Sequence, residues 1–171
     1  NCALDLGGEM SCWGYGADLY EMPGVFEQVS VGEGNVCGLR TDGAIECAGE
    51  NLFGEAEPPT GKNFVLVATS RFYACGLLDG GEVVCWGSED KFQEMDNDKH
   101  TFSDIAVGIY DICGITLDGL VVCWGSSLGS SEKGKPSDSV SSIDVGLAFA
   151  CAIGIDETIS CWGVNDDRIQ S

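Results

Sequence analysis

The chain has 171 residues, of which 44% are hydrophobic, so it is long enough for one domain with its own core. Eight basic and 28 acidic residues give a net charge of −20, which argues against nucleic-acid or anionic-lipid binding and favours cations or a basic partner. No apolar run approaches the length of a membrane-spanning helix and no signal peptide is visible, so we expect no membrane insertion.

One motif, two cysteines separated by nine residues, recurs five times along the chain. The copies begin at Cys2, Cys37, Cys75, Cys113 and Cys151, which lie 35, 38, 38 and 38 residues apart. A fixed period near 38 residues predicts a solenoid or a propeller built from one repeated unit. The even and regular use of all ten cysteines is typical of secreted proteins and predicts an extracellular or cell-surface location.

Each unit is predicted to contain three short strands, which are clearest in the second unit. Phe26–Gly32 alternates apolar and polar residues, Val36–Arg40 forms the next strand, Thr41–Gly43 is a turn, and Ala44–Cys47 is the third strand. The first of these strands recurs with the same offsets from Phe64, Phe102 and Val140. We therefore expect an all-β domain over residues 1–171, with units at about 1–25, 26–63, 64–101, 102–139 and 140–171.

The hairpin that follows predicts a disulfide in every unit. If the turn centres on Asp42, then Cys37 faces Cys47 across the strand pair and Leu39 faces Ile45 on the same side of the sheet. Directly opposed residues have Cα atoms about 4.5–5.5 Å apart, which suits a disulfide. The same register pairs the cysteines of the five units as Cys2–Cys12, Cys37–Cys47, Cys75–Cys85, Cys113–Cys123 and Cys151–Cys161.

Apolar or small residues lie on both faces of these strands, so each small sheet should be covered on both sides by its neighbours. The residue after the first cysteine is small in every copy: Ala3, Gly38, Gly76, Gly114 and Ala152. A tryptophan follows the second cysteine in four units, and we expect Trp13, Trp86, Trp124 and Trp162 to wedge between adjacent blades. Ala48 takes this position in the second unit, so that junction should be packed differently.

Metal and catalytic sites find little support in the sequence. Zinc is the rival interpretation of the cysteines, but their spacing does not fit a zinc knuckle and His100 is the only histidine. The pairs Asp96 with Asp98 and Asp166 with Asp167 are candidates for calcium, although neither follows the EF-hand pattern. We expect no catalytic residues, no cofactor and no metal, and therefore no enzyme activity.

The motifs V-x-V-x-G and C-G-L-x-x-D-G-x-V-x-C-W-G resemble those of the RCC1-like repeat family, and the second is seen from Cys75 to Gly87 with Gly80 in place of the aspartate. The resemblance spans almost the whole chain and is strongest to secreted, cysteine-containing short repeats, as in bacterial extracellular proteins and CRINKLY4-like receptor ectodomains. It implies a β-propeller, usually of seven blades, or part of one, here with five three-stranded blades of about 38 residues, each with its C-x9-C hairpin disulfide. Nuclear members of the family lack this acidity and these disulfides, so we do not transfer their nucleotide-exchange or chromatin activities.

The chain departs from the family pattern at its two ends. The hairpin from Cys2 to Cys12 lacks a preceding V-x-V-x-G strand, and residues 164–171 do not supply one. The chain also begins on Asn1 rather than on methionine. We therefore expect a piece excised from a longer polypeptide, whose missing strand comes from a flanking domain or a neighbouring subunit.

Three classes of function remain open. The first is a structural or adhesive module of a cell-surface or filamentous assembly, whose partner is a protein or, as a second candidate, a glycan. The second is the ligand-binding ectodomain of a receptor, and the third is a secreted enzyme inhibitor that uses a propeller face. The connectors Tyr15–Val25, Glu50–Asn63, Ser88–Thr101 and Ser126–Ser139 vary most and should carry the contacts.

Overall fold

The computed structural model describes residues 1–14, 20–89, 100–125, 128 and 134–163. The elements named there are all β-strands, arranged as a series of small antiparallel sheets, and no α-helix is present in these ranges. The chain divides into two compact units, Asn1–Asp79 with Val83–Glu89, and Gly80–Glu82 with Asp90–Ser171.

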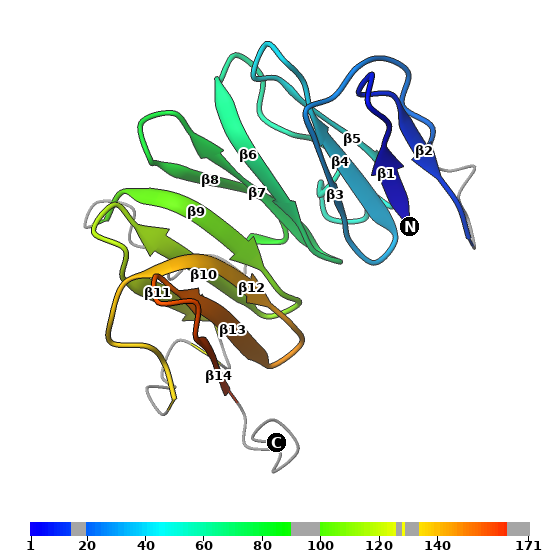
Figure 1. The fold of residues 1–171 in the computed structure, drawn as a ribbon. Helices are drawn as coiled ribbons and strands as arrows, with labels where there is room; N and C mark the ends of the chain where they lie inside the picture. Colours follow the sequence, from blue (N-terminus) through cyan, green and yellow to red (C-terminus); the bar gives the residue numbers. More distant parts are fainter. Residues whose placement is uncertain (15–19, 90–99, 126–127, 129–133, 164–171) are drawn as a thin grey trace. The chain divides into compact units, whose positions relative to one another are not determined.

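The first compact unit contains one two-stranded and two three-stranded sheets. Strands β1 (Cys2–Leu4) and β2 (Met10–Cys12) form the first hairpin. The next two sheets are β3 (Gln28–Val31), β4 (Asn35–Leu39) and β5 (Ile45–Gly49), then β6 (Phe64–Thr69), β7 (Tyr73–Leu78) and β8 (Val83–Gly87). Figure 1 shows these sheets following one another in chain order, and the first sheet lacks the inner strand, as its missing V-x-V-x-G segment predicts.

The second compact unit contains two more three-stranded sheets of the same topology. These are β9 (Phe102–Val107), β10 (Asp111–Thr116) and β11 (Val121–Gly125), followed by β12 (Val140–Val145), β13 (Phe149–Gly154) and β14 (Ile159–Gly163). In all four three-stranded sheets the central strand pairs antiparallel with both neighbours. The all-β architecture and the repeated three-strand unit expected from the sequence are therefore confirmed.

Every hairpin has the register that the cysteine spacing predicts. Cys37 is opposite Cys47 and Leu39 is opposite Ile45, and the other hairpins repeat this pairing. The structure joins the opposed cysteines as five disulfides, Cys2–Cys12, Cys37–Cys47, Cys75–Cys85, Cys113–Cys123 and Cys151–Cys161. The cysteine Cα atoms lie 4.0–4.1 Å apart, closer than the separation of standard strand pairs.

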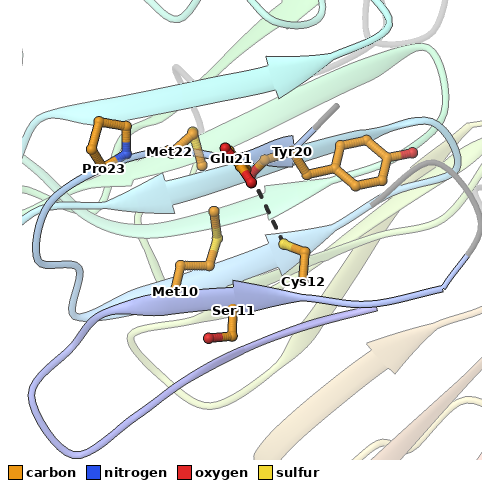
Figure 2. Close-up of a pocket in the computed structure, with 7 residues that line it drawn as sticks. All are labelled: Met10, Ser11, Cys12, Tyr20, Glu21, Met22 and Pro23. Atoms are coloured by element: carbon orange, nitrogen blue, oxygen red, sulfur yellow. Dashed lines mark hydrogen bonds between the residues drawn. The ribbon is translucent and has the colours of Figure 1, made fainter. Parts of the chain in front are cut away.

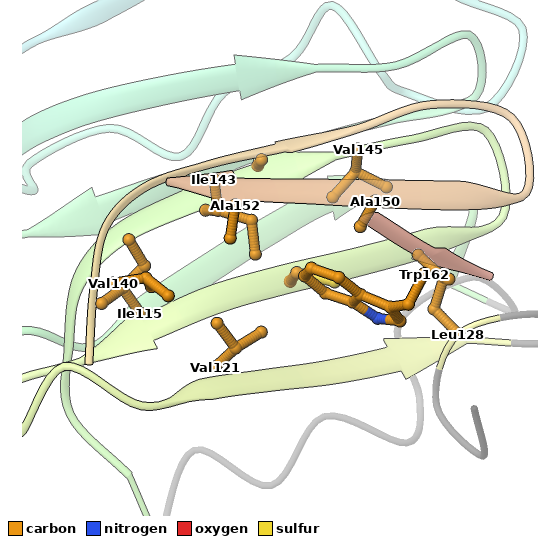
Figure 3. Close-up of a cluster of buried hydrophobic side chains, with 11 residues drawn as sticks. Ile115, Val121, Leu128, Val140, Ile143, Val145, Ala150, Ala152 and Trp162 are labelled. Carbon is orange, nitrogen blue, oxygen red and sulfur yellow. The ribbon is translucent and has the colours of Figure 1, made fainter. Parts of the chain in front are cut away.

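The core lies between successive sheets rather than within any one of them. One cluster joins the disulfide face of β4 and β5 to the next sheet, and its buried members are Cys37, Leu39, Ile45, Phe64, Val67, Ala74 and Trp86. Figure 3 shows the corresponding cluster in the second compact unit, where Ile115 and Val121 face Val140, Ile143 and Trp162. One repeat thus supplies an apolar disulfide face, and the following repeat covers it.

Polar contacts reinforce the junction between β3 and β6. The Gln28 side chain donates to the backbone oxygen of Val67 at 3.1 Å and accepts from its nitrogen at 2.9 Å. The Ser30 hydroxyl lies 3.0 Å from that of Thr69 and accepts from the Thr69 nitrogen. These bonds hold the inner strands of two sheets in a fixed register.

Candidate functional site

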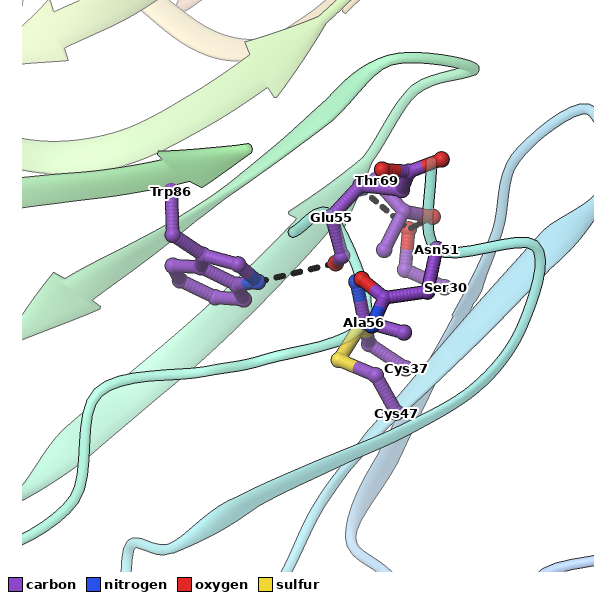
Figure 4. Close-up of a disulfide and its surroundings, with 8 residues drawn as sticks. All are labelled: Ser30, Cys37, Cys47, Asn51, Glu55, Ala56, Thr69 and Trp86. Atoms are coloured by element: carbon purple, nitrogen blue, oxygen red, sulfur yellow. Dashed lines mark hydrogen bonds between the residues drawn. A yellow bond between two sulfur atoms is a disulfide. The ribbon is translucent and has the colours of Figure 1, made fainter. Parts of the chain in front are cut away.

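The tryptophans show how one repeat packs on the repeat before it. Trp86 is 7% exposed and lies in the cluster with Leu39 and Ile45 of the preceding sheet. Its ring lies 6.1 Å from that of Phe64, and its Nε1 donates to the backbone oxygen of Glu55 at 3.0 Å (Figure 4). Because Glu55 belongs to the connector between the two sheets, this bond ties the connector to the junction.

Glu55 is a buried residue whose role the sequence did not reveal. It is 1% exposed, and its carboxylate accepts hydrogen bonds from the backbone nitrogens of Leu52 and Phe53 at 3.2 and 2.7 Å. These bonds form a tight turn that brings the Glu55 carbonyl beneath the indole of Trp86. The short spacing from Leu52 to Glu55 is compatible with many loop conformations. The turn that Glu55 holds beside Trp86 is therefore apparent only in the structure.

Two other tryptophans are also buried, and one is not. Trp162 is 2% exposed among Ile115, Val121 and Leu128, and Trp124 is 8% exposed with its ring 5.2 Å from that of Phe102. Trp13, however, is 54% exposed among the described residues, and its place between two blades stays a prediction. Trp86 and Trp162 each pack on the disulfide face of the preceding sheet.

The junction without tryptophan contains a pocket. Ala48 packs there with Tyr20, Met22, Phe26 and Val36 against the first hairpin. Beside this cluster is a cavity of about 640 Å³, lined by Met10, Ser11, Cys12, Tyr20, Glu21, Met22 and Pro23. Figure 2 shows Met10 and Cys12 pointing toward the connector residues, whereas Ser11 points to the opposite side of its strand. The pocket therefore lies between the first hairpin and the connector that follows it.

The pocket combines apolar side chains with one exposed carboxylate, that of Glu21. Met22 is 9% exposed, Met10 and Tyr20 are half-buried, and Glu21 is exposed. The Cys12 sulfur lies 3.9 Å from the Tyr20 backbone oxygen, and both residues line the pocket. Such a site fits a side chain with an apolar stem and a positive head group.

Arg40 holds the connector in place beside this pocket. Its guanidinium donates to both Glu46 carboxylate oxygens, at 2.8 and 2.6 Å, and to the Pro23 backbone oxygen at 2.9 Å. The hydrogen bonds with Glu46 raise the pKa of Arg40, so its charge persists at any physiological pH. The guanidinium also lies 4.6 Å from the centre of the Phe26 ring, a cation–π arrangement.

His100 is exposed, with its ring 6.1 Å from that of Phe102. Asp96, Asp98, Asp166 and Asp167 lie outside the described residues. Within the described residues, no three histidine, cysteine or acidic side chains are grouped as metal ligands. The described part of the chain also has no helix of the length and hydropathy needed to cross a bilayer.

Comparison with known proteins identifies the repeat. Residues 64–93 match the family model described as the Regulator of chromosome condensation (RCC1) repeat. No curated protein sequence matches the chain. Yeast Prp20 from Saccharomyces cerevisiae, an RCC1 protein, shares the fold at 19% identity and a TM-score of 0.62, over 80% of this chain and 44% of that one.

Two receptor ectodomains are more similar. The CRINKLY WD40 ectodomain of the Arabidopsis thaliana receptor kinase ACR4 is 27% identical, with a TM-score of 0.76 over 95% of this chain and 61% of that one. The entire ectodomain of the Physcomitrella patens receptor kinase CR4 is 26% identical, with a TM-score of 0.79 over 96% and 49%. The chain thus spans about half to three fifths of the length of these ectodomains. The resemblance found in the sequence is confirmed: residues 64–93 match the RCC1 repeat, and the repeated sheets share the fold of these propeller ectodomains.

Proposed function

We propose that the chain is a non-catalytic extracellular module that binds a protein partner in a cell-surface or filamentous assembly. The observation that carries the proposal is that the ten cysteines form disulfides within their own repeats and leave no free thiol. Disulfides of this kind persist in oxidising compartments and are rare in the cytosol. The similarity to two receptor-kinase ectodomains supports the same location.

The pocket beside the first hairpin is the proposed place of contact. Met10 and Met22 provide apolar walls, Tyr20 provides a ring, and Glu21 provides an exposed carboxylate. A lysine or arginine of the partner would place its stem along the methionines and its charge near Glu21. The net charge of −20 would draw a basic partner toward the module and speed its encounter.

The proposal is tested with the purified, oxidised protein on intact cells of its source organism. Biotinylated protein is titrated onto the cells and photo-crosslinked, and the captured proteins are identified by mass spectrometry. We expect saturable binding to a protein, weakened by Glu21→Lys because the reversed charge repels a basic side chain. The matched control is Glu27→Lys, which makes the same charge change at an exposed position outside the pocket.

Two results would contradict different parts of the proposal. Equal binding by the Glu21→Lys and Glu27→Lys proteins would remove the pocket as the place of contact. Antibodies to the module that label only permeabilised cells would place the protein inside the cell and overturn the extracellular function itself. Crosslinking to glycan alone, without a protein, would also contradict it.

A receptor ectodomain is the second candidate, favoured by the similarity to ACR4 and CR4. The full precursor sequence decides between the two. A downstream membrane span followed by a kinase domain would support the receptor. Many tandem extracellular domains without a membrane span would support the structural module.

A further inference from the structure

The connector between the second and third repeats displays two large apolar side chains to solvent. Leu52 is 80% exposed and Phe53 is 52% exposed. The Phe53 ring meets the half-buried ring of Phe72 edge to face, with 5.8 Å between the ring centroids. These three residues are here called the loop surface. It belongs to the first compact unit, and the sheets before and after its connector are complete.

Hydrogen bonds hold this connector in one conformation. The buried Glu55 carboxylate accepts from the backbone nitrogens of both Leu52 and Phe53. The Asn51 side chain closes the base of the loop, where it accepts from the Ala56 nitrogen at 3.1 Å. A loop that is ordered before binding has little conformational freedom left to lose on contact, so its exposed side chains can contribute more of their energy to a partner.

A comparison with the fourth repeat shows that the leucine of this connector is turned outward. The third residue after the outer strand is a leucine in both repeats, Leu52 and Leu128. Leu128 is 1% exposed and packs with Trp162 of the next repeat. In the second connector the Glu55 carbonyl instead contacts the tryptophan of the next repeat, Trp86. The Glu55 turn thus takes over the contact with the tryptophan and leaves Leu52 in solvent.

The charges around the loop surface are mainly negative. The Arg71 guanidinium lies 5.1 Å from the centre of the Phe72 ring and pairs with Glu33 at 3.0 Å, so its charge is balanced. Glu50 and Glu57, at the two ends of the loop, are exposed and form no ion pair among the described residues. An apolar group beside a positive charge complements this surface, whereas a second copy of the chain, with its charge of −20, would be repelled.

We infer that the loop surface binds an apolar side chain of a protein partner that has a lysine or arginine next to it. Leu52, Phe53 and Phe72 contact the apolar side chain, and Glu50 attracts the adjacent cation. Large apolar side chains on an ordered surface are the kind of residue that carries most of the energy of a protein interface. The inference rests on the proposed function as a protein-binding module, and it adds a contact made by residues outside the pocket.

A random-peptide display library, panned on the intact, oxidised protein, tests the inference. Selection on the wild type alternates with removal of peptides that bind the Phe53→Ser protein, so binders of other surfaces are discarded. We expect the remaining peptides to share an apolar residue beside a lysine or arginine. A synthetic copy of one such peptide is then titrated with each variant by fluorescence anisotropy.

Leu52→Asn should weaken binding of the synthetic peptide about tenfold or more. Leu117→Asn is the matched control, because Leu117 is 67% exposed in the hairpin turn of the fourth repeat. Glu50→Lys should also weaken binding, and added salt should reduce its difference from the wild type. Its control is Glu27→Lys, the same charge change at an exposed residue just before β3. Melting of each variant shows that it is folded.

Hydrogen exchange of the free protein checks the order of the loop. The amide protons of Leu52 and Phe53 should exchange slowly although their side chains are exposed, because both amides bond to a buried carboxylate. Rapid exchange at both positions would overturn the inference.

The binding measurements can also contradict it. No peptide that prefers the wild type, selected peptides without a basic residue, or equal binding by the Leu52→Asn and Leu117→Asn proteins would each overturn the inference. Self-association that Leu52→Asn abolishes would identify a second copy as the occupant and overturn it as well. The cell-binding test of Glu21→Lys does not involve the loop surface, so the two proposals fail separately.

Discussion

At the scale of single residues, the inner strand of a repeat packs closely on the central strand where the central strand has a glycine, and even one added methyl group would clash there. In the third repeat, a Cβ added to Gly76 would lie 2.5 Å from a Phe64 ring carbon. Gly38 and Gly114 stand in the same relation to Phe26 and Phe102. The fifth repeat has Ala152 in place of glycine and Val140 in place of phenylalanine, so the smaller inner-strand residue makes room for the methyl group.

Gly76→Ala should therefore destabilise the protein by about 1–3 kcal/mol, because the Phe64 ring must leave its position. The double variant Phe64→Val with Gly76→Ala reproduces the pair found in the fifth repeat, and its loss should be smaller than the sum of the single losses. Urea unfolding of the four proteins measures this coupling. Strictly additive losses would show that the ring and the glycine do not compete for space.

Glu157 has a φ of 67°, in the left-handed region that disfavours residues with a Cβ. Glu157→Gly should stabilise the protein by about 0.5–1 kcal/mol, since the turn geometry is kept and the steric cost is removed. Gly8 has a φ of 80°, and a Cβ there would lie 2.7 Å from the Phe26 backbone oxygen. Gly8→Glu should therefore lower the free energy of unfolding by more than Glu157→Gly raises it. Thermal unfolding checks both, and a destabilised Glu157→Gly protein would contradict the argument.

Asp104 and Asp156 should make the stability of the protein depend on pH in opposite directions. Burial raises the pKa of Asp104, so the stability it contributes is present at low pH and is lost as pH rises through its folded-state pKa. Hydrogen bonds from Thr158, whose hydroxyl lies 2.6 Å away, lower the pKa of Asp156, so its contribution is present above the unfolded-state pKa and is lost as pH falls through the folded-state value.

Asp104→Asn should therefore gain stability relative to the wild type at neutral pH, and this gain should shrink in acid. Asp156→Asn should lose stability at neutral pH, and this loss should shrink in acid. Urea midpoints measured across the acid range test both signs, with each variant serving as the control for the other. Parallel curves for the two variants would show that neither carboxylate is perturbed as described.

At the scale of the element, the hairpin and its disulfide form the repeated unit. Cys37 is fully buried in the junction with the next sheet, whereas Cys2 is only half-buried. Each disulfide joins residues 10 apart in sequence, so its effect on the entropy of the unfolded chain should be the same in every repeat. Differences between repeats should then reflect packing.

Replacing Cys37 and Cys47 together by alanine should cost about 2–3 kcal/mol from chain entropy, with a further loss from the cavity left in the core. The same change at Cys2 and Cys12 should cost the entropic part and less of the packing part. Chemical unfolding of the two double variants measures the difference. Equal losses would show that the buried disulfide contributes nothing beyond its crosslink.

At the scale of the whole molecule, covalent staples rather than metal ions should maintain the fold. Small sheets that bury their faces only against neighbours depend on each other and on their disulfides. We expect dithiothreitol to lower the melting temperature strongly and EDTA to leave it unchanged. A steep fall with EDTA alone would reveal a metal site involving the acidic residues outside the described ranges.

Local pattern was sufficient for much of this architecture. The strand positions, the hairpin register and the side of each strand that carries Cys37 or Leu39 follow from period-two alternation and a turn of constant length. The absence of an inner strand before Cys2 was also visible in the sequence. These features depend only on residues that are close together along the chain.

Other features depend on segments that are distant in sequence, and these required the tertiary structure. The exposure of Trp13, the burial of Glu55 beneath Trp86 and the pocket beside Ala48 each depend on which segment packs against which. Ile153 and Ile159 have the same sequence pattern as Leu39 and Ile45, yet only the latter pair is covered. The sequence by itself determined the repeat and its hairpins, because both are local. The tertiary structure decided which residue at each repeated position is buried and by which neighbour, because burial depends on segments that no single repeat encodes.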